Sequence, residues 1–137
     1  MIYINGRDLT LEQVMEVARG GEKVAMTDES KAAVKKAREY VDQKLKEKAV
    51  IYGLTTGFGE FSKVYIPQEL TATLQRNLII SHACGMGEPL PEQVVRAAML
   101  LRCNALSKGN SGIRLSTIET MLNMLNKGVH PVIPEKG

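Results

Sequence analysis

Apolar and polar residues alternate in ways that predict two helices and two short strands in the first third of the chain. Ile2 and Ile4 alternate with their neighbours, as in a strand, and residues 24–26 form a second apolar run. Thr10 and Gln13 have the spacing of a capping box, so we expect a short helix after Thr10 that ends near residues 20–21. Thr27 offers an N-cap for a longer helix, whose apolar stripe is Val34, Ala37, Val41 and Leu45.

The second half of the chain predicts three more helices. Pro67 suits the first turn of a helix that runs to about Cys84, and Pro91 opens the next one, which stops near Gly109. The helix after Pro91 is so densely apolar that it should lie in a core. A last helix is expected at residues 115–126. The pattern indicates one mainly α domain of five helices with a small β ribbon, without an internal repeat or a dividing linker.

Composition agrees with a globular chain and excludes several classes of protein. Hydrophobic residues make up 44% and charged residues 24% of the 137 residues. The net charge is only +3, and the few aromatic residues do not interleave with Lys and Arg, so no nucleic-acid partner is expected. Two cysteines without a C-x-x-C pair fit a reduced, cytoplasmic setting. The chain has neither the pattern of a signal peptide nor a long apolar run, so we expect no export and no membrane.

Two features could carry chemistry. Residues 53–59 include three glycines in seven positions, which predicts a loop with special backbone angles, and Tyr52 lies at its edge. Ser81 and His82 lie at the end of a predicted helix. By residue type alone, such a tyrosine most often packs against apolar neighbours, and a lone histidine at a helix end most often caps the helix. His82 and Cys84, considered as metal ligands together with the distant His130, would point to different helix faces, and no carboxylate or thiol completes the set, so no metal site is expected.

Four ordered motifs change this assessment. They are Ile51-Tyr-Gly-Leu-Thr-Thr-Gly-Phe-Gly59, Leu74-Gln-Arg-Asn-Leu78, Ser81-His-Ala-Cys-Gly85 and Arg102-Cys-Asn-Ala-Leu-Ser-Lys-Gly109 with Ser111, Gly112 and Arg114. With these motifs, the sequence resembles the aromatic amino-acid ammonia-lyase family over nearly all of its length. The resemblance implies the helical N-terminal domain of the ammonia-lyase/fumarase-like fold, with a Gly-rich active-site loop. It also implies a methylidene-imidazolone electrophile, self-cyclised from Ala-Ser-Gly, and a homotetramer in full-length members.

The resemblance assigns roles to three residues. Tyr52 matches the family base that removes the β-proton. An ordinary phenol has a pKa of about 10, so such a base needs neighbours that favour the phenolate. His82 matches a position that contacts the substrate side chain, where a histidine can hydrogen-bond an imidazole or a phenol. Gly59 resembles a loop glycine that lies against bound substrate. The motif around Ser81 is closer to the histidine-specific members, which implies deamination of L-histidine to urocanate and ammonia.

One departure from the family is decisive for activity. No Ala-Ser-Gly occurs in this chain, and in the family that tripeptide follows the segment that resembles Pro131–Gly137. Asn110-Ser111-Gly112 matches a different family segment and is interpreted as structural. We therefore expect residues 1–137 to be the N-terminal portion of a catalytic domain, truncated before the electrophile and inactive alone.

Three alternatives remain open at this point. The chain could belong to a tyrosine ammonia-lyase or to an aminomutase of the same family. It could also be a non-catalytic assembly module that pairs with a separate chain carrying the electrophile. In each case partner helices are missing, so we expect an exposed apolar face on the helices Val94–Leu106 and Leu115–Leu125 and self-association through it.

Overall fold

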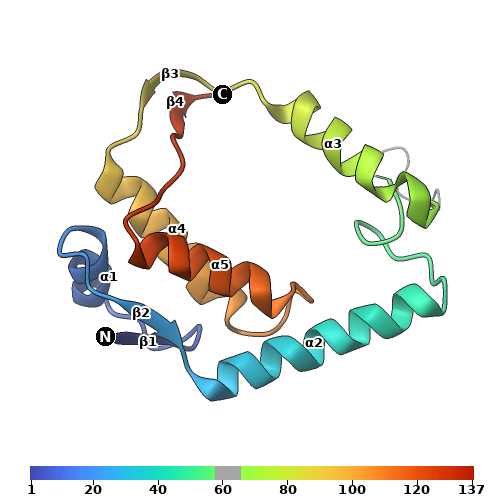
Figure 1. Ribbon diagram of the computed structural model, residues 1–137, viewed down its shortest axis with the longest axis horizontal. Helices are drawn as coiled ribbons and strands as arrows, with labels where there is room; N and C mark the ends of the chain where they lie inside the picture. The colour runs from blue at the N-terminus through green and yellow to red at the C-terminus, as the bar shows by residue number, and fades with distance from the viewer. Residues whose placement is uncertain (58–65) are drawn as a thin grey trace.

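The computed structural model describes residues 1–57 and 66–137, and it is mainly helical, as the sequence predicts. The α-helices are α1 (Leu11–Ala18), α2 (Asp28–Lys46), α3 (Thr71–His82), α4 (Glu92–Leu106) and α5 (Leu115–Asn126). A short 3₁₀ helix, η2 (Gln68–Leu70), leads into α3. The strands are β1 (Ile2–Ile4), β2 (Val24–Met26), β3 (Met86–Pro89) and β4 (Pro134–Lys136). The elements follow one another around an open ring, with α3 on the side away from α1 and the first two strands (Figure 1).

The first two helices begin where their capping residues predict. The Thr10 hydroxyl accepts a hydrogen bond from the Gln13 N–H at 3.3 Å, and the Gln13 side chain accepts one from the Thr10 N–H at 3.1 Å. At the start of α2, the Thr27 hydroxyl accepts from the Ser30 N–H at 3.2 Å. These bonds satisfy N–H groups that have no partner within a helix.

The strands form two small ribbons where the sequence predicted one. β1 and β2 pair in parallel, with Ile2 opposite Val24, and α1 makes the connection between them. The second ribbon, β3 with β4, is antiparallel and was not predicted. Its strand at residues 86–89 is exposed throughout, so it lacks the alternation of buried and exposed residues that marks a strand in a sequence.

The core lies where α4 packs against α1 and α5. Leu100 and Cys103 of α4 are fully buried, and so are Val17 of α1 and Ile118 of α5. The prediction that α4 belongs in a core is correct for this face. Its other face exposes large apolar side chains, including Leu101.

A buried arginine joins three helices within this core. Arg96 of α4 donates from Nη2 to the Val17 carbonyl at 2.8 Å, from Nε to the Ala18 carbonyl at 3.2 Å and from Nη1 to the Leu125 carbonyl at 3.2 Å. The last carbonyls of a helix have no partner within that helix, so one guanidinium serves the ends of both α1 and α5. Arg96 therefore fixes the positions of these two helices relative to α4.

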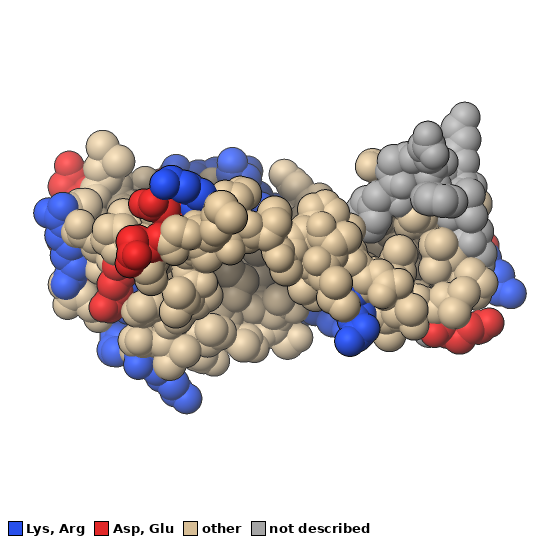
Figure 2. Space-filling model, turned by 90° about the horizontal axis from the view of Figure 1, so that it is seen from above, with Lys and Arg blue, Asp and Glu red and all other residues tan. Residues whose placement is uncertain are grey.

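By contrast, α3 lies outside the core. None of its residues whose burial is described is buried, and Ile79 is 68% exposed. Arg76 is its only Lys, Arg, Asp or Glu. Figure 2 shows few charged side chains in the middle of the molecule on this side. Among residues 1–57 and 66–137, no helix combines the length and the apolar character that a membrane span requires.

Replacing Arg96 with Met should lower the free energy of unfolding by about 3 kcal/mol, because partly buried carbonyls lose a charged donor. Arg96→Lys should recover part of the loss, since an ammonium cannot reach all three carbonyls at once. Urea denaturation measures these differences. Arg102→Met, on the exposed side of the same helix, is the matched control and should change stability little. Equal effects at the two positions would contradict the role given to Arg96.

The two thiols should differ sharply in reactivity. Burial raises the pKa of Cys103 to about 11, whereas Cys84 is exposed. A disulfide reagent at pH 8 should label Cys84 in the folded chain and both thiols in urea. Because the unfolded thiol loses its proton first, stability should fall as pH rises from its usual pKa toward 11. Equally fast labelling of both thiols in the folded chain would refute this assignment.

Candidate active site

Tyr52 lies in a tight turn that follows α2. The N–H groups of Leu54 and Thr55 both donate to the Ile51 carbonyl, at 3.1 and 3.0 Å. Gly53 has a φ of +72°, which a residue with a side chain rarely adopts. A glycine directly after Tyr52 therefore allows the chain to reverse while the tyrosine stays at the surface, 64% exposed.

Two buried threonines hold this turn. The Thr55 hydroxyl donates to the Ala49 carbonyl at 2.6 Å and accepts from the Ile51 N–H at 2.9 Å. The Thr56 hydroxyl accepts from the Gly53 N–H at 3.2 Å. Both threonines are nearly inaccessible to solvent. These positioning residues were not predicted from the sequence, although adjacent threonines between glycines are a recognisable signal for hydroxyl-stabilised turns.

His82 is the last residue of α3, and its ring is held by the helix itself. Nδ1 lies 2.9 Å from the Leu78 carbonyl oxygen and 3.0 Å from the Ser81 hydroxyl. The Ser81 hydroxyl donates to the same carbonyl at 2.9 Å, and the tautomer with its proton on Nδ1 can donate there as well. In the neutral ring, Nε2 is then the acceptor. The exposed imidazole therefore offers an oriented acceptor to a ligand.

Tyr52 and His82 belong to different parts of the α3 region. The turn with Tyr52 connects to the segment before α3, where the Ile66 N–H donates to the Thr55 carbonyl at 2.9 Å. In Figure 1 residues 49–57 lie at the first half of α3. His82 ends that 12-residue helix, which is about 18 Å long. The structure thus holds the Tyr52 turn and the His82 ring through separate local hydrogen bonds, and a shared role for the two remains a prediction. Gly59, the third predicted site residue, lies outside the described residues.

The end of the described chain lies beside the end of α3. A Cβ on Gly137 would lie 2.7 Å from the Gly85 Cα and 2.9 Å from the Cys84 carbonyl oxygen. The pairing of β3 with β4 produces this contact, and Figure 1 shows the C-terminus next to the connection between α3 and β3. Residue 137 is thus adjacent to a residue only three positions after His82.

Comparisons with known proteins show which family has this arrangement. The profile of the aromatic amino acid lyase family matches residues 9–137. A histidine ammonia-lyase from Alkaliphilus metalliredigens is 57% identical over 136 residues, which is 99% of this chain and 27% of that relative. The chain therefore spans about a quarter of the length of the curated relatives it matches.

Solved structures agree with the sequence match. Histidine ammonia-lyase from Trypanosoma cruzi has a TM-score of 0.90 at 36% identity and covers 99% of this chain, which covers 26% of it. A tyrosine aminomutase from Streptomyces globisporus has a TM-score of 0.92 at 36% identity, with the same coverage. The resemblance stated from four motifs is confirmed over nearly the whole sequence. This chain belongs to the aromatic amino acid lyase family.

Proposed function

We propose that this chain is the N-terminal part of a histidine ammonia-lyase, which converts L-histidine to urocanate and ammonia. The observation that carries the proposal is the 57% identity to a histidine ammonia-lyase over 99% of the chain. Identity to the T. cruzi enzyme and to the tyrosine aminomutase is 36% in both cases, so the fold by itself does not choose between the two activities. The higher identity to curated histidine ammonia-lyases favours histidine.

Tyr52 supplies the base in this proposal. The β-proton of an amino acid is weakly acidic, so its removal needs a base at a fixed position. The Thr55 and Thr56 hydrogen bonds hold the backbone on either side of Gly53, and the phenol remains accessible from solvent. This arrangement suits a group that meets a ligand at the surface of this chain and takes a proton from it.

His82 selects the substrate ring. With its proton on Nδ1, the imidazole presents Nε2 as an acceptor for a substrate N–H or O–H. An imidazole or a phenol can donate that hydrogen bond, whereas a phenyl ring cannot. This chemistry fits histidine and also fits tyrosine, and it disfavours phenylalanine.

The electrophile must come from polypeptide other than residues 1–137. Members of the family build it from Ala-Ser-Gly, a tripeptide that this sequence lacks, so these residues do not form the methylidene-imidazolone themselves. Polypeptide that continued from Gly137 would start against Gly85, close to His82 in the chain. That proximity supports a site in which His82 lies near the segment that follows residue 137 in the relatives.

The alternatives differ in substrate and in assembly. The likeness to a tyrosine aminomutase supports a tyrosine ammonia-lyase or an aminomutase as the second candidate. An assembly module that pairs with a separate electrophile-bearing chain is the third. Exposed apolar residues on and before α3 (Leu70, Ile79 and Ile80) support self-association in every case. The two free thiols agree with a reducing, cytoplasmic setting.

In a longer polypeptide that includes Ala-Ser-Gly, Tyr52→Phe should lower kcat for histidine by at least about a hundredfold and leave KM nearly unchanged, because only the base is lost. The absorbance of urocanate measures turnover. Tyr40→Phe, at another exposed tyrosine, should retain normal turnover. The 137-residue chain alone should release no urocanate. A nearly normal rate for Tyr52→Phe would remove this tyrosine from its role, and turnover by the short chain would disprove the need for an added electrophile.

Replacing His82 with Phe in the same longer polypeptide should lower kcat/KM for histidine by roughly tenfold to a hundredfold, the value of one lost hydrogen bond. Relative activity on phenylalanine should rise. His130→Phe changes the other histidine of this chain and is the matched control. Competition assays with histidine, tyrosine and phenylalanine give the preference. An unchanged order of preference in His82→Phe would eliminate His82 as the specificity residue.

A further inference from the structure

An open surface cavity of about 390 Å³ lies across the molecule from α3, lined by residues of three segments. The segments are the turn after β1, the start of α2 and the end of α4. Because β1 and β2 are parallel, both of their carboxyl ends lie at this corner, and open parallel sheets bind ligands beyond those ends. In Figure 1 the corner between β1 and α2 lies opposite α3.

Gly6 brings two cations to the cavity. Its N–H donates to the Asn104 side chain of α4 at 2.8 Å, and a Cβ at Gly6 would lie 2.4 Å from Cγ of Lys108. The φ of +84° at Gly6 and the Asn104 carbonyl oxygen 3.0 Å from such a Cβ favour glycine here, and Arg7 after β1 and Lys108 after α4 both line the cavity. In the part of the chain that the structure describes, neither cation forms an ion pair.

Ser30 adds a buried hydroxyl that lacks a protein partner. The residue is 6% exposed and lines the cavity, and its N–H is bonded to Thr27. Within residues 1–57 and 66–137, no hydrogen bond involves its hydroxyl, and no unbonded polar side-chain atom is fully sealed from solvent. The hydroxyl therefore reaches solvent on the cavity side, where it can donate to a ligand.

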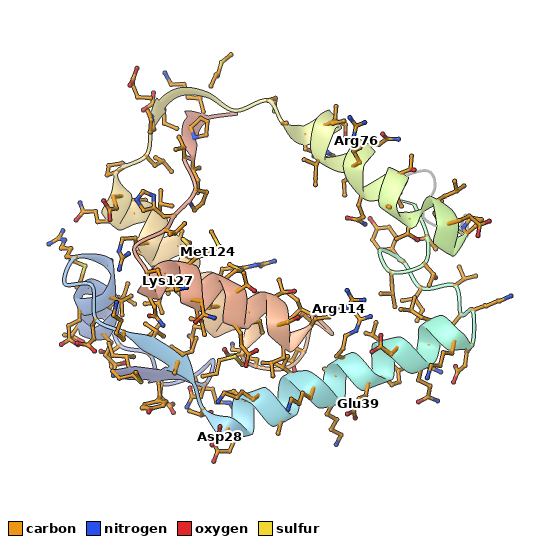
Figure 3. All side chains as sticks on the ribbon, viewed as in Figure 1. Asp28, Glu39, Arg76, Arg114, Met124 and Lys127 are labelled. Carbon is orange, nitrogen blue, oxygen red and sulfur yellow. The ribbon has the colours of Figure 1, made fainter. Side chains whose placement is uncertain are left out.

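The charges around the cavity favour an anion. The 19-residue helix α2 begins here, so the positive end of its dipole adds to Arg7 and Lys108. Glu29 is the one carboxylate among the lining residues. The Asp28 carboxylate is not a lining group: it pairs with Lys31 at 3.0 Å, and Figure 3 shows Asp28 on the outer side of the start of α2.

We propose that this cavity binds a phosphate group, with Arg7 and Lys108 as charge partners and the Ser30 hydroxyl as a buried donor. A volume of about 390 Å³ has room for inorganic phosphate and also for a small phosphate monoester, so either can supply the group. The site uses neither Tyr52 nor His82, and it is independent of the lyase activity proposed above.

Isothermal titration of the chain with inorganic phosphate, in chloride buffer of matched ionic strength, tests the proposal. We expect saturable binding at one site. Lys108→Met keeps the aliphatic stem beside Gly6 and should weaken binding by about tenfold, and Ser30→Ala by about threefold to tenfold. Lys36→Met removes an exposed charge from α2 away from the cavity and should have no effect. A parallel titration with glycerol 3-phosphate separates the two sources: tighter binding of the monoester assigns an organic phosphate, and equal or weaker binding assigns inorganic phosphate.

A variant that binds phosphate more tightly cannot be explained by loss of folding, so it complements the variants that weaken binding. Glu29→Gln removes the opposing carboxylate and should tighten phosphate binding by about threefold or more. Circular dichroism checks that each variant is folded. Absence of saturable binding with both phosphates would overturn the proposal. So would an equal loss of affinity in Lys36→Met and Lys108→Met, or unchanged affinity in Glu29→Gln.

Discussion

The packed half of this molecule depends on one buried guanidinium. Arg96 donates to carbonyls of α1 and α5 from its place in α4, over distances of 2.8–3.2 Å. Helix ends that meet inside a protein leave carbonyls without partners, and leaving them unpaired costs free energy. A planar fork of donors satisfies both ends together, which a lysine cannot do. The end of α5 is in turn joined to β2, because the Asn126 side chain bonds both backbone groups of Val24.

The other half of the ring is held differently. α3 contributes nothing to the core and is connected to it through the β3–β4 ribbon on one side and the turn after α2 on the other. The family roles of Tyr52 and His82 fall in this half, outside the packed core. Hydrogen bonds to near neighbours hold the backbone turn that carries Tyr52 and the imidazole of His82, and neither residue belongs to the core. An incomplete site of this kind is consistent with a chain that spans about a quarter of its relatives' length.

The two proposed sites lie in different halves of the molecule. The phosphate cavity belongs to the packed half, where Gly6 lets the turn after β1 approach α4. Tyr52 and His82, for which we propose roles in the lyase reaction, belong to the open half, where apolar side chains of α3 remain exposed. The proposed phosphate binding therefore uses only groups within residues 1–137, whereas the proposed deamination also needs an electrophile that they lack.

The sequence alone predicts the features of this protein that depend on residues close together in the chain. The caps at Thr10 and Thr27 involve partners three residues away, and the motif around Tyr52 is contiguous, so helix starts, the mainly α class and the family followed without coordinates. Contacts between residues that are far apart in the sequence could not be predicted from it. Arg96 meets Val17 across 79 positions, Gly6 meets Asn104 across 98, and β3 pairs with a strand beyond two helices. Nothing local distinguishes these residues, because their partners are defined only when the chain packs.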